Sequence, residues 1–585
     1  MTAKGRNAAD WGSDLMAQAL RDMGAEWVFL NPGSSFRGLH DSLVNYLGDE
    51  KPKMGLATHE ASAVAMAHGY AKATGKTGFA ILHNLVGLMN GSMSVFNAFC
   101  DQTPLVILGG SGPADPGKRR FIDWAHSANT QGDLVRPYVK WTDEPATLDG
   151  ALDSMLRAGR IAHTAPPGPV YVSLDAGLQE EPLDGPRETG AALPRYAPPA
   201  PVTPDPAAIE RVAKTLLQAT APLIVCGRLG IDARATAPLV RLVEATGAAY
   251  LDDRCTVCLP TRHPQNMNGD KKVKSEADVI LAIDVHDLTL ATRGYGTGRS
   301  QIMGTGAGAE DAHVIDLSMN DWFGNSWARF GGPTPPLDDQ IIADPLAGLV
   351  ALADAVERLG SDANVLAARR DALAARHAKI QEAAQARLSD RSPESPVSME
   401  RLTHEVYQLV KDEDWRLVVR NHRSWRDGYW DFPGCGHYLG GDGGGGVGYG
   451  PGAAVGAAIG LKGTGALPVA IIGDGDFMMA PGALWTAAHH DAPLLVVLMN
   501  NRSWGNDELH QREVAKQRGR AVERAHIGQR TEDPEADLAA IARGFGAWAT
   551  GPIDDPEAVA PALREALAEV KRGKVAVVEV ITALD

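Results

Sequence analysis

Short hydrophobic runs alternate with segments of helical periodicity along most of the chain. In the first third, Trp27–Leu30 and Gly78–Leu82 have the pattern of buried strands. Between them, residues 58–74 carry apolar residues at helical spacing, and Gly75 ends the pattern. Because strands that alternate with helices form parallel sheets covered on both faces, the pattern predicts an α/β fold.

Two polar segments divide this pattern into three blocks. Residues 180–206 are rich in proline, glycine and charge, which is typical of an exposed linker. A second break at 389–396 follows a helical segment rich in alanine and arginine. We therefore predict three doubly wound parallel-sheet domains, at residues 1–185, 200–360 and 395–585.

Composition disfavours several classes of function. The 585-residue chain has 56 Lys and Arg against 72 Asp and Glu, a net charge of −16, which does not suit a nucleic-acid binder or a protein that sits on anionic lipid. Five cysteines are too few for a disulfide scaffold, and the hydrophobic runs are too short to cross a bilayer. The start has no apolar signal segment. We therefore expect a cytoplasmic protein that acts on small molecules.

The strongest chemical signal lies within residues 469–501. One hydrophobic strand ends in Gly473-Asp474-Gly475-Asp476, and the next ends in Asn500-Asn501. The carboxyl ends of parallel strands meet at one edge of a sheet, where open α/β sheets bind ligands. The carboxylate of Asp474 and the amide oxygen of Asn501 suit Mg²⁺, and the N–H groups of the following helix suit phosphate oxygens. Two ligands alone would not hold the ion, so this pattern predicts a metal–diphosphate site.

Further motifs occur in the first and third blocks: Asn31-Pro32-Gly33-Ser34, His59-Glu60-Ala61, Leu82-His83-Asn84 and Gly445-Gly446-Val447-Gly448-Tyr449-Gly450. Together with a Gly-Asp-Gly that precedes Asn-Asn by 24 residues, they make the chain resemble the thiamine-diphosphate (ThDP) enzyme superfamily. This superfamily includes acetolactate synthase, benzoylformate decarboxylase and pyruvate decarboxylase. The resemblance extends over nearly the whole chain and implies ThDP and Mg²⁺ as cofactors.

The resemblance gives Glu60 the role of the activating acid. A carboxyl group hydrogen-bonded to N1′ of the aminopyrimidine promotes the tautomer whose 4′-imino group removes the C2 proton. In the family, this acid comes from one subunit and the metal-binding Asp474 from its neighbour. The resemblance therefore implies a homodimer at minimum, and we expect a homotetramer.

The same resemblance assigns the remaining cofactor contacts. Asp474, Asn501 and the carbonyl of Ser503 would bind Mg²⁺, and Val447 occupies the position of the apolar wedge that bends the cofactor. Asp476 departs from the family, which usually has a small hydroxyl residue there. The full set of predicted cofactor-binding residues is Glu60, Asn421, Ser424, Gly445, Val447, Gly473, Asp474, Gly475, Asp476 and Asn501.

Substrate-side chemistry is predicted in the first block. Ser34 and His83 match positions that line the pocket over C2 in benzoylformate decarboxylase-like enzymes, and a histidine can shuttle protons near neutral pH. Asn84, next to His83, is a further catalytic candidate. A group of aromatic residues after the third strand either forms the wall of the substrate pocket or packs the domain edge: Phe121, Trp124 and His126.

Four functions stay open at this point. A 2-oxo acid decarboxylase fits Ser34 and His83, whereas a 2-hydroxyacyl-CoA lyase fits the basic run Lys118-Arg119-Arg120, which could meet CoA phosphates. An acetolactate synthase-like carboligase is the third possibility, and the resemblance implies that it would bind FAD in the middle block. Because no clear nucleotide motif occurs there, we expect no FAD. A non-catalytic regulatory relative is disfavoured because Glu60 and the metal-binding motif are retained.

Overall fold

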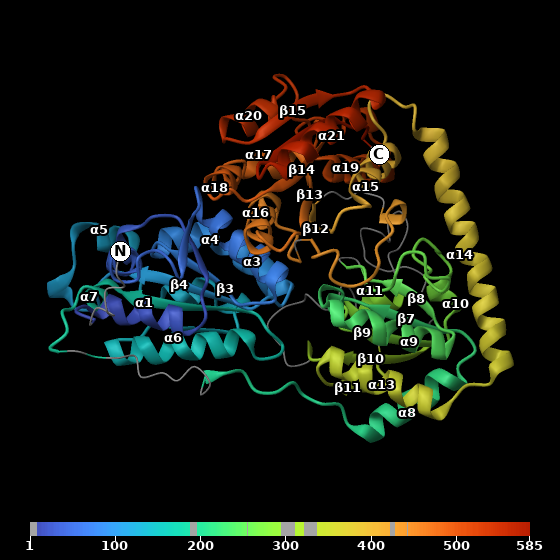
Figure 1. Cartoon of the computed structure of the whole chain (residues 1–585), viewed down its shortest axis with the longest axis horizontal. Coiled ribbons are helices and arrows are strands. Elements are labelled where there is room, and N and C mark those ends of the chain that lie inside the picture. Colours follow the sequence, from blue (N-terminus) through green and yellow to red (C-terminus); the bar gives the residue numbers. More distant parts are fainter. Residues whose placement is uncertain are drawn as a thin grey trace.

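Three parallel β-sheets, each covered by helices, organise the chain (Figure 1). The computed structural model describes residues 9–185, 187, 196–253, 256–293, 311–320, 336–421, 427–441 and 443–584. Each sheet takes its strands from one of the three segments predicted as domains, and the α/β prediction is confirmed. The domain boundaries themselves stay a prediction.

The first sheet has six strands in the order β2-β1-β3-β4-β6-β5. Its strands are β1 (Trp27–Leu30), β2 (Lys53–Leu56), β3 (Gly78–Leu82), β4 (Leu105–Ser111), β5 (Trp141–Asp143) and β6 (Pro169–Asp175). Its helices are α1 (Gly12–Asp22), α2 (Arg37–Asp41), α3 (Glu60–Thr74), α4 (Leu85–Cys100), α5 (Phe121–His126), α6 (Leu148–His163) and α7 (Ala176–Gln179). β3, at the centre, is buried along its whole length, so its end carries His83 to the edge where α4 begins.

The central sheet has five strands in the order β11-β10-β9-β7-β8. They are β7 (Pro222–Cys226), β8 (Ala249–Asp252), β9 (Val279–Ile283), β10 (His313–Ser318) and β11 (Asp339–Ile342). The helices are α8 (Pro206–Gln218), α9 (Thr236–Thr246), α10 (Val273–Glu276), α11 (Leu288–Arg293) and α13 (Pro345–Leu359). The long α14 (Ala363–Arg391) then runs along one side of the molecule to the third sheet (Figure 1).

The third sheet has the order β12-β13-β14-β16-β15. It contains β12 (Trp415–Asn421), β13 (Leu467–Gly473), β14 (Leu494–Asn500), β15 (Trp548–Ile553) and β16 (Val575–Ile581). Its helices are α15 (Met399–Val410), α16 (Tyr449–Leu461), α17 (Asp474–Met479), α18 (Ala483–His489), α19 (Gly505–Gln517), α20 (Leu538–Gly544) and α21 (Pro556–Lys571). No described helix is long and apolar enough to cross a membrane.

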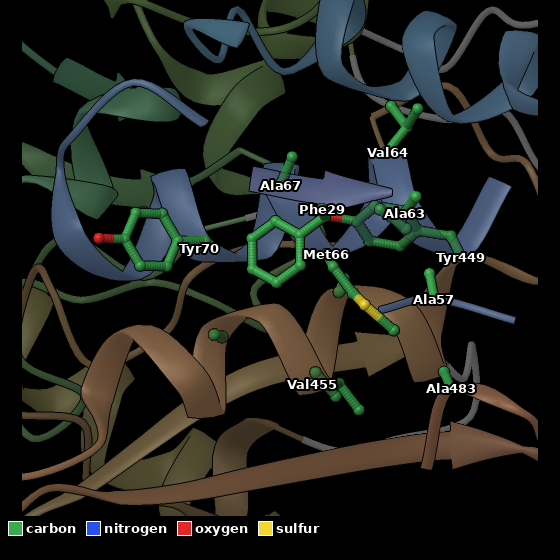
Figure 2. Close-up of a cluster of buried hydrophobic side chains, with 14 of the residues drawn as sticks. Phe29, Ala57, Ala63, Val64, Met66, Ala67, Tyr70, Tyr449, Val455 and Ala483 are labelled. Carbon is green, nitrogen blue, oxygen red and sulfur yellow. The ribbon is translucent and has the colours of Figure 1, made fainter. Parts of the chain in front are cut away.

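Helix α3 of the first sheet packs directly on α16 of the third. Figure 2 shows Met66 of α3 extending toward α16, and Met66 and Val455 belong to one buried hydrophobic cluster. The backbones approach closely because glycines face the contact: a Cβ at Gly69 would lie 2.0 Å from the carbonyl oxygen of Ala453, and one at Gly456 would lie 1.9 Å from that of Met66. The first and third sheets are therefore joined through a tight helix pair.

Candidate active site

The Gly-Asp-Gly motif lies where the sequence predicts it. β13 ends at Gly473, which pairs with Met499 near the end of β14, and α17 begins at Asp474. The carboxylates of Asp474 and Asp476 are both buried at this edge of the sheet. The two polar clusters of the sequence are thus neighbours on adjacent strands.

Asp474, Asn501 and Ser503, the three predicted metal ligands, lie together. The N–H of Ser503 donates to Oδ1 of Asn501 at 3.0 Å and also to the carboxylate of Asp474. Asp474 is only 4% exposed, and burial raises its pKa to about 6. Among the described residues Asp474 has no ion pair, so a cation beside it would favour the ionised carboxylate.

Asp474 also borders a small cavity of about 20 Å³, roughly the room that one water occupies. Arg502 and Glu579 line this cavity, whereas Asn501 and Ser503 do not. The described residues contain no cluster of three or more His, Cys, Asp or Glu side chains that could hold a metal. A metal here would therefore need amide, main-chain and cofactor oxygens, which is the ligand set predicted from the sequence.

Asp476 faces the glycine-rich loop of residues 443–448. Its Oδ1 accepts from the N–H of Gly448 and its Oδ2 from that of Gly450 at 3.1 Å. N–H groups at the start of a helix have no acceptor within the helix, and a carboxylate at this end stabilises it. Asp476 provides that carboxylate for α16. Asp476, which replaces the usual small hydroxyl residue, therefore forms hydrogen bonds with the backbone at the end of the glycine-rich loop and the start of α16.

The first sheet's helices contact both this loop and Gly441, which precedes it in the chain. Oδ1 of Asn97 in α4 accepts from the N–H of Gly446 at 3.3 Å, and Nζ of Lys72 in α3 donates to the carbonyl of Gly441 at 2.7 Å. Gly445 has a φ of +69°, a conformation that favours glycine. Val447, the predicted wedge, is 41% exposed beside it.

Glu60 is the first residue of α3, behind the N-cap His59. Its side chain is buried, and Nδ2 of Asn90 donates to its Oε2 at 3.1 Å. Packing of α3 on α16 brings this helix to the third sheet within one chain, whereas the resemblance implies that the two halves of the site come from different subunits. A Cβ at Gly87 would lie 3.4 Å from Oε1 of Glu60 and 2.9 Å from Cβ of His83, so Glu60 and His83 flank the same glycine.

Ser35, which the sequence analysis missed, contacts His83. Its buried hydroxyl lies 2.7 Å from Nδ1 of His83 and accepts from the N–H of Asn84 at 3.1 Å. Ser34 is instead exposed and lines an open groove of about 570 Å³ that also includes Arg37. The sequence could not separate these serines because they are adjacent at the same strand end.

Asn84 and His126 complete this polar group. Nδ2 of Asn84 donates to the hydroxyl of Ser127 at 3.1 Å, whereas no described residue donates to its buried Oδ1. Nε2 of His83 lies 3.1 Å from Nδ1 of His126. Burial, with a smaller contribution from His126, lowers the pKa of His83. Three further candidates fall outside what the structure describes: Ser424 and the side chains of Trp124 and Asn421.

The chain matches known proteins at both halves of this site. Residues 10–129 match the thiamine pyrophosphate enzyme N-terminal TPP binding domain, and residues 419–580 match the C-terminal TPP binding domain. The fold and both matches define a cofactor-dependent enzyme: the chain belongs to the thiamine-diphosphate-dependent enzyme superfamily.

Individual relatives agree with this assignment. The chain is 27% identical over 549 residues to benzoylformate decarboxylase from Pseudomonas aeruginosa, covering 90% of this chain and 91% of that one. It is 24% identical over 584 residues to a probable acetolactate synthase large subunit from Methanocaldococcus jannaschii, covering 95% and 90%. Its fold is similar to that of the ThDP-dependent 4-hydroxybenzoylformate decarboxylase of Rhodococcus jostii RHA1, with a TM-score of 0.76 and 24% identity over 98% of this chain and 99% of that one.

Proposed function

We propose that this enzyme is a ThDP- and Mg²⁺-dependent carbon–carbon lyase that decarboxylates a 2-oxo acid. When bound, ThDP supplies a carbon nucleophile for the substrate carbonyl and an electron sink for breaking the adjacent bond. The observation that carries the proposal is the packing of α3, which begins with Glu60, on α16, together with the hydrogen bonds of the glycine loop to Asn97 of α4 and to Asp476.

Each half of the site has a separate task in this proposal. Asp474, Asn501 and the Ser503 carbonyl would hold Mg²⁺ and the diphosphate. Glu60 would hold a proton at N1′ of the aminopyrimidine, and the carbonyl of Gly445 would accept from its amino group. The buried position of Glu60 strengthens such a hydrogen bond because the local dielectric is low.

The basic run favours a 2-oxo acid over an acyl-CoA. Arg119 donates to the carbonyls of Pro113 and Ala114, and Arg120 pairs with Asp123 and Glu180. Two of the three cations that would meet CoA phosphates are thus engaged within the chain. A carboligase acting on 2-oxo acids is the second candidate, favoured by similarity to acetolactate synthases.

A substrate screen tests this proposal. The protein loaded with ThDP and Mg²⁺ is mixed with aromatic and aliphatic 2-oxo acids, aldehydes and 2-hydroxyacyl-CoAs. We expect CO₂ and an aldehyde from a 2-oxo acid without any need for CoA. Release of formyl-CoA would select the lyase acting on 2-hydroxyacyl-CoAs, and a 2-hydroxy-2-methyl-3-oxo acid from pyruvate would select the carboligase; either result would overturn the decarboxylase assignment.

We also propose that the chain works as a homo-oligomer. Apolar side chains are exposed around the glycine loop and on α4 near the site: Met89, Met93, Val447, Met478 and Met479. Light scattering should give two or four times the 61.9 kDa mass of one chain. A monomer that turns over substrate normally would contradict this, and would leave the site within one chain.

Replacing Asp476 should weaken cofactor binding through the glycine loop. Asp476→Ala removes the acceptor for the N–H groups of Gly448 and Gly450, and we expect about a tenfold rise in the Kd for ThDP, since a lost charge-assisted hydrogen bond costs about 1.5 kcal/mol. Asp476→Asn keeps one acceptor oxygen and should lose less. Calorimetric titration measures both, and equal affinity of Asp476→Ala and wild type would contradict the anchoring role.

A further inference from the structure

Both ring nitrogens of His83 are already occupied. Nδ1 faces the Ser35 hydroxyl at 2.7 Å and Nε2 faces Nδ1 of His126 at 3.1 Å. Because the Ser35 oxygen accepts from the N–H of Asn84, its own proton is free to be donated to Nδ1 of His83. Neutral His83 then carries its proton on Nε2 and donates it to His126.

The open ring nitrogen of this group belongs to His126. No described residue forms a hydrogen bond with its Nε2, and the ring is only partly buried at the end of α5. The start of the same helix is open to solvent, since Phe121 is 79% exposed. Both rings are partly exposed, but both nitrogens of His83 have partners, so among the described contacts only Nε2 of His126 is open to water and a substrate.

We propose that Ser35, His83 and His126 form a unit that holds one exchangeable proton, and that Nε2 of His126 is the point where this proton passes to the substrate. The proposal rests on the 2-oxo acid decarboxylation proposed above. His126 is then the catalytic residue, and His83 and Ser35 are positioning residues.

The geometry allows the unit to hold one added proton but not two. When His126 is protonated, its Nδ1–H donates to Nε2 of His83, and the proton of His83 moves to Nδ1 and is donated to the Ser35 oxygen. A hydroxyl oxygen can accept this hydrogen bond together with the one from Asn84. Protonation of both rings would place two N–H groups against each other at the 3.1 Å contact, so the pair titrates as one coupled group.

Burial and charge act in opposite directions on His83. Burial and the neighbouring His126 ring disfavour its protonated form and lower its pKa, and Glu60 from α3 and Asp123 from α5 only partly offset this effect. Asp123 is itself paired with Arg120. An added proton is therefore not fixed on His83 and can be passed on.

The proton is used once in each turnover. When the bond to the carboxylate breaks, CO₂ leaves and its bonding electron pair stays with the former carbonyl carbon. The N–H of Nε2 in His126 gives its proton to that carbon, and the unit returns to its neutral form. A proton from the bulk solvent is then taken up at Nε2, so that in net terms one 2-oxo acid anion and one proton become CO₂ and an aldehyde.

Nuclear magnetic resonance of the cofactor-free full chain tests the shared proton directly. Histidine labelled at Cε1 is titrated between pH 5 and 8, with the two signals assigned from His83→Gln and His126→Gln. We expect both signals to move with one common midpoint, and Ser35→Ala to shift it, while Ser34→Ala leaves it unchanged. Two independent titrations, or no effect of Ser35→Ala, would overturn the proposal.

Kinetics tests the exchange point. His126→Gln should lower kcat by about 100-fold or more, the usual size of a general acid–base contribution. KM should change by less than roughly threefold, because substrate binding is kept. His163→Gln, at the exposed end of α6, is the matched control and should keep wild-type kcat.

The outcomes separate this proposal from the one on which it rests. Normal turnover by His126→Gln would refute the proton-transfer role while the decarboxylase assignment stands. Failure of the wild type to decarboxylate any 2-oxo acid would refute the assignment and the transfer step with it. The resonance titration would still decide whether His83 and His126 share one proton.

Discussion

Glu60→Gln is expected to lower kcat by about 10³-fold while the protein stays folded and still binds ThDP. The substitution keeps the shape of the side chain and an oxygen that accepts from Asn90. It removes the proton that the carboxyl group holds at the aminopyrimidine, and an amide has no equivalent acid–base function. Steady-state turnover of the 2-oxo acid found in the screen measures the loss, and calorimetry measures ThDP affinity.

Glu50→Gln provides the control for this experiment. Glu50 is exposed in the same part of the chain and lies outside the site, so its replacement should leave kcat and ThDP affinity at wild-type values. The thermal transition of Glu60→Gln should stay close to that of wild type, because a first-turn acid contributes only about 0.3–1 kcal/mol to its helix. Wild-type turnover in Glu60→Gln would mean that another group activates the cofactor.

The strand ends were predictable because a buried strand and the polar residues that follow it are both visible in a short stretch of sequence. β1 (Trp27–Leu30) and β3 (Gly78–Leu82) agree with the hydrophobic runs to the residue. Continuous apolar runs mark strands buried on both faces, and the polar residue that follows such a run must lie at the sheet edge. The order of the Gly-Asp-Gly and Asn-Asn clusters therefore predicted their proximity correctly.

The contacts between side chains were not predictable in the same way. Whether Ser34 or Ser35 faces His83 depends on the short 3₁₀ turn that begins at Ser34, where a rotation of one residue exchanges the buried and exposed positions. The His83–His126 contact joins two segments 43 residues apart in the chain. Contacts of this kind depend on the path that a loop takes over the sheet. Hydrophobic periodicity carries no information about that path.

Asp476 illustrates a further limit of sequence motifs. At the position of a diphosphate-binding hydroxyl, a second acid suggests repulsion, yet its oxygens accept from the N–H groups of Gly448 and Gly450. The partner of this carboxylate is the backbone of a loop, and backbone N–H groups carry no sequence signature. The role of the acid at this position therefore became clear only from the folded structure.

Asp474→Asn is expected to stabilise the cofactor-free protein at pH 8. Burial raises the pKa of Asp474 from 3.8 to about 6, so the protonated form is the one that favours folding. This contribution is fully present below pH 3.8, and it is lost as the pH rises through about 6. At pH 8 the buried carboxylate is ionised at a cost of roughly 3 kcal/mol, which asparagine avoids. Urea unfolding of wild type and variant at pH 5 and 8 measures the difference, which should shrink at the lower pH.

The same substitution should reverse the order of stability once Mg²⁺ and ThDP are added. Ligands at about 1,000 times their Kd stabilise the folded wild type by about 4.1 kcal/mol, which exceeds the cost of the buried carboxylate at pH 8, whereas the asparagine variant, without the carboxylate that binds the ion, should gain almost nothing. Because a metal binds the ionised carboxylate, the gain of wild type should also fall when the pH drops below about 6. Asp554→Asn, an exposed change in the same domain, should behave as wild type throughout. If Asp474→Asn gained as much stability from Mg²⁺ and ThDP as wild type does, the metal assignment would be wrong. The assignment depends on a buried carboxyl group that resists ionisation by itself and becomes ionised when a cation binds beside it.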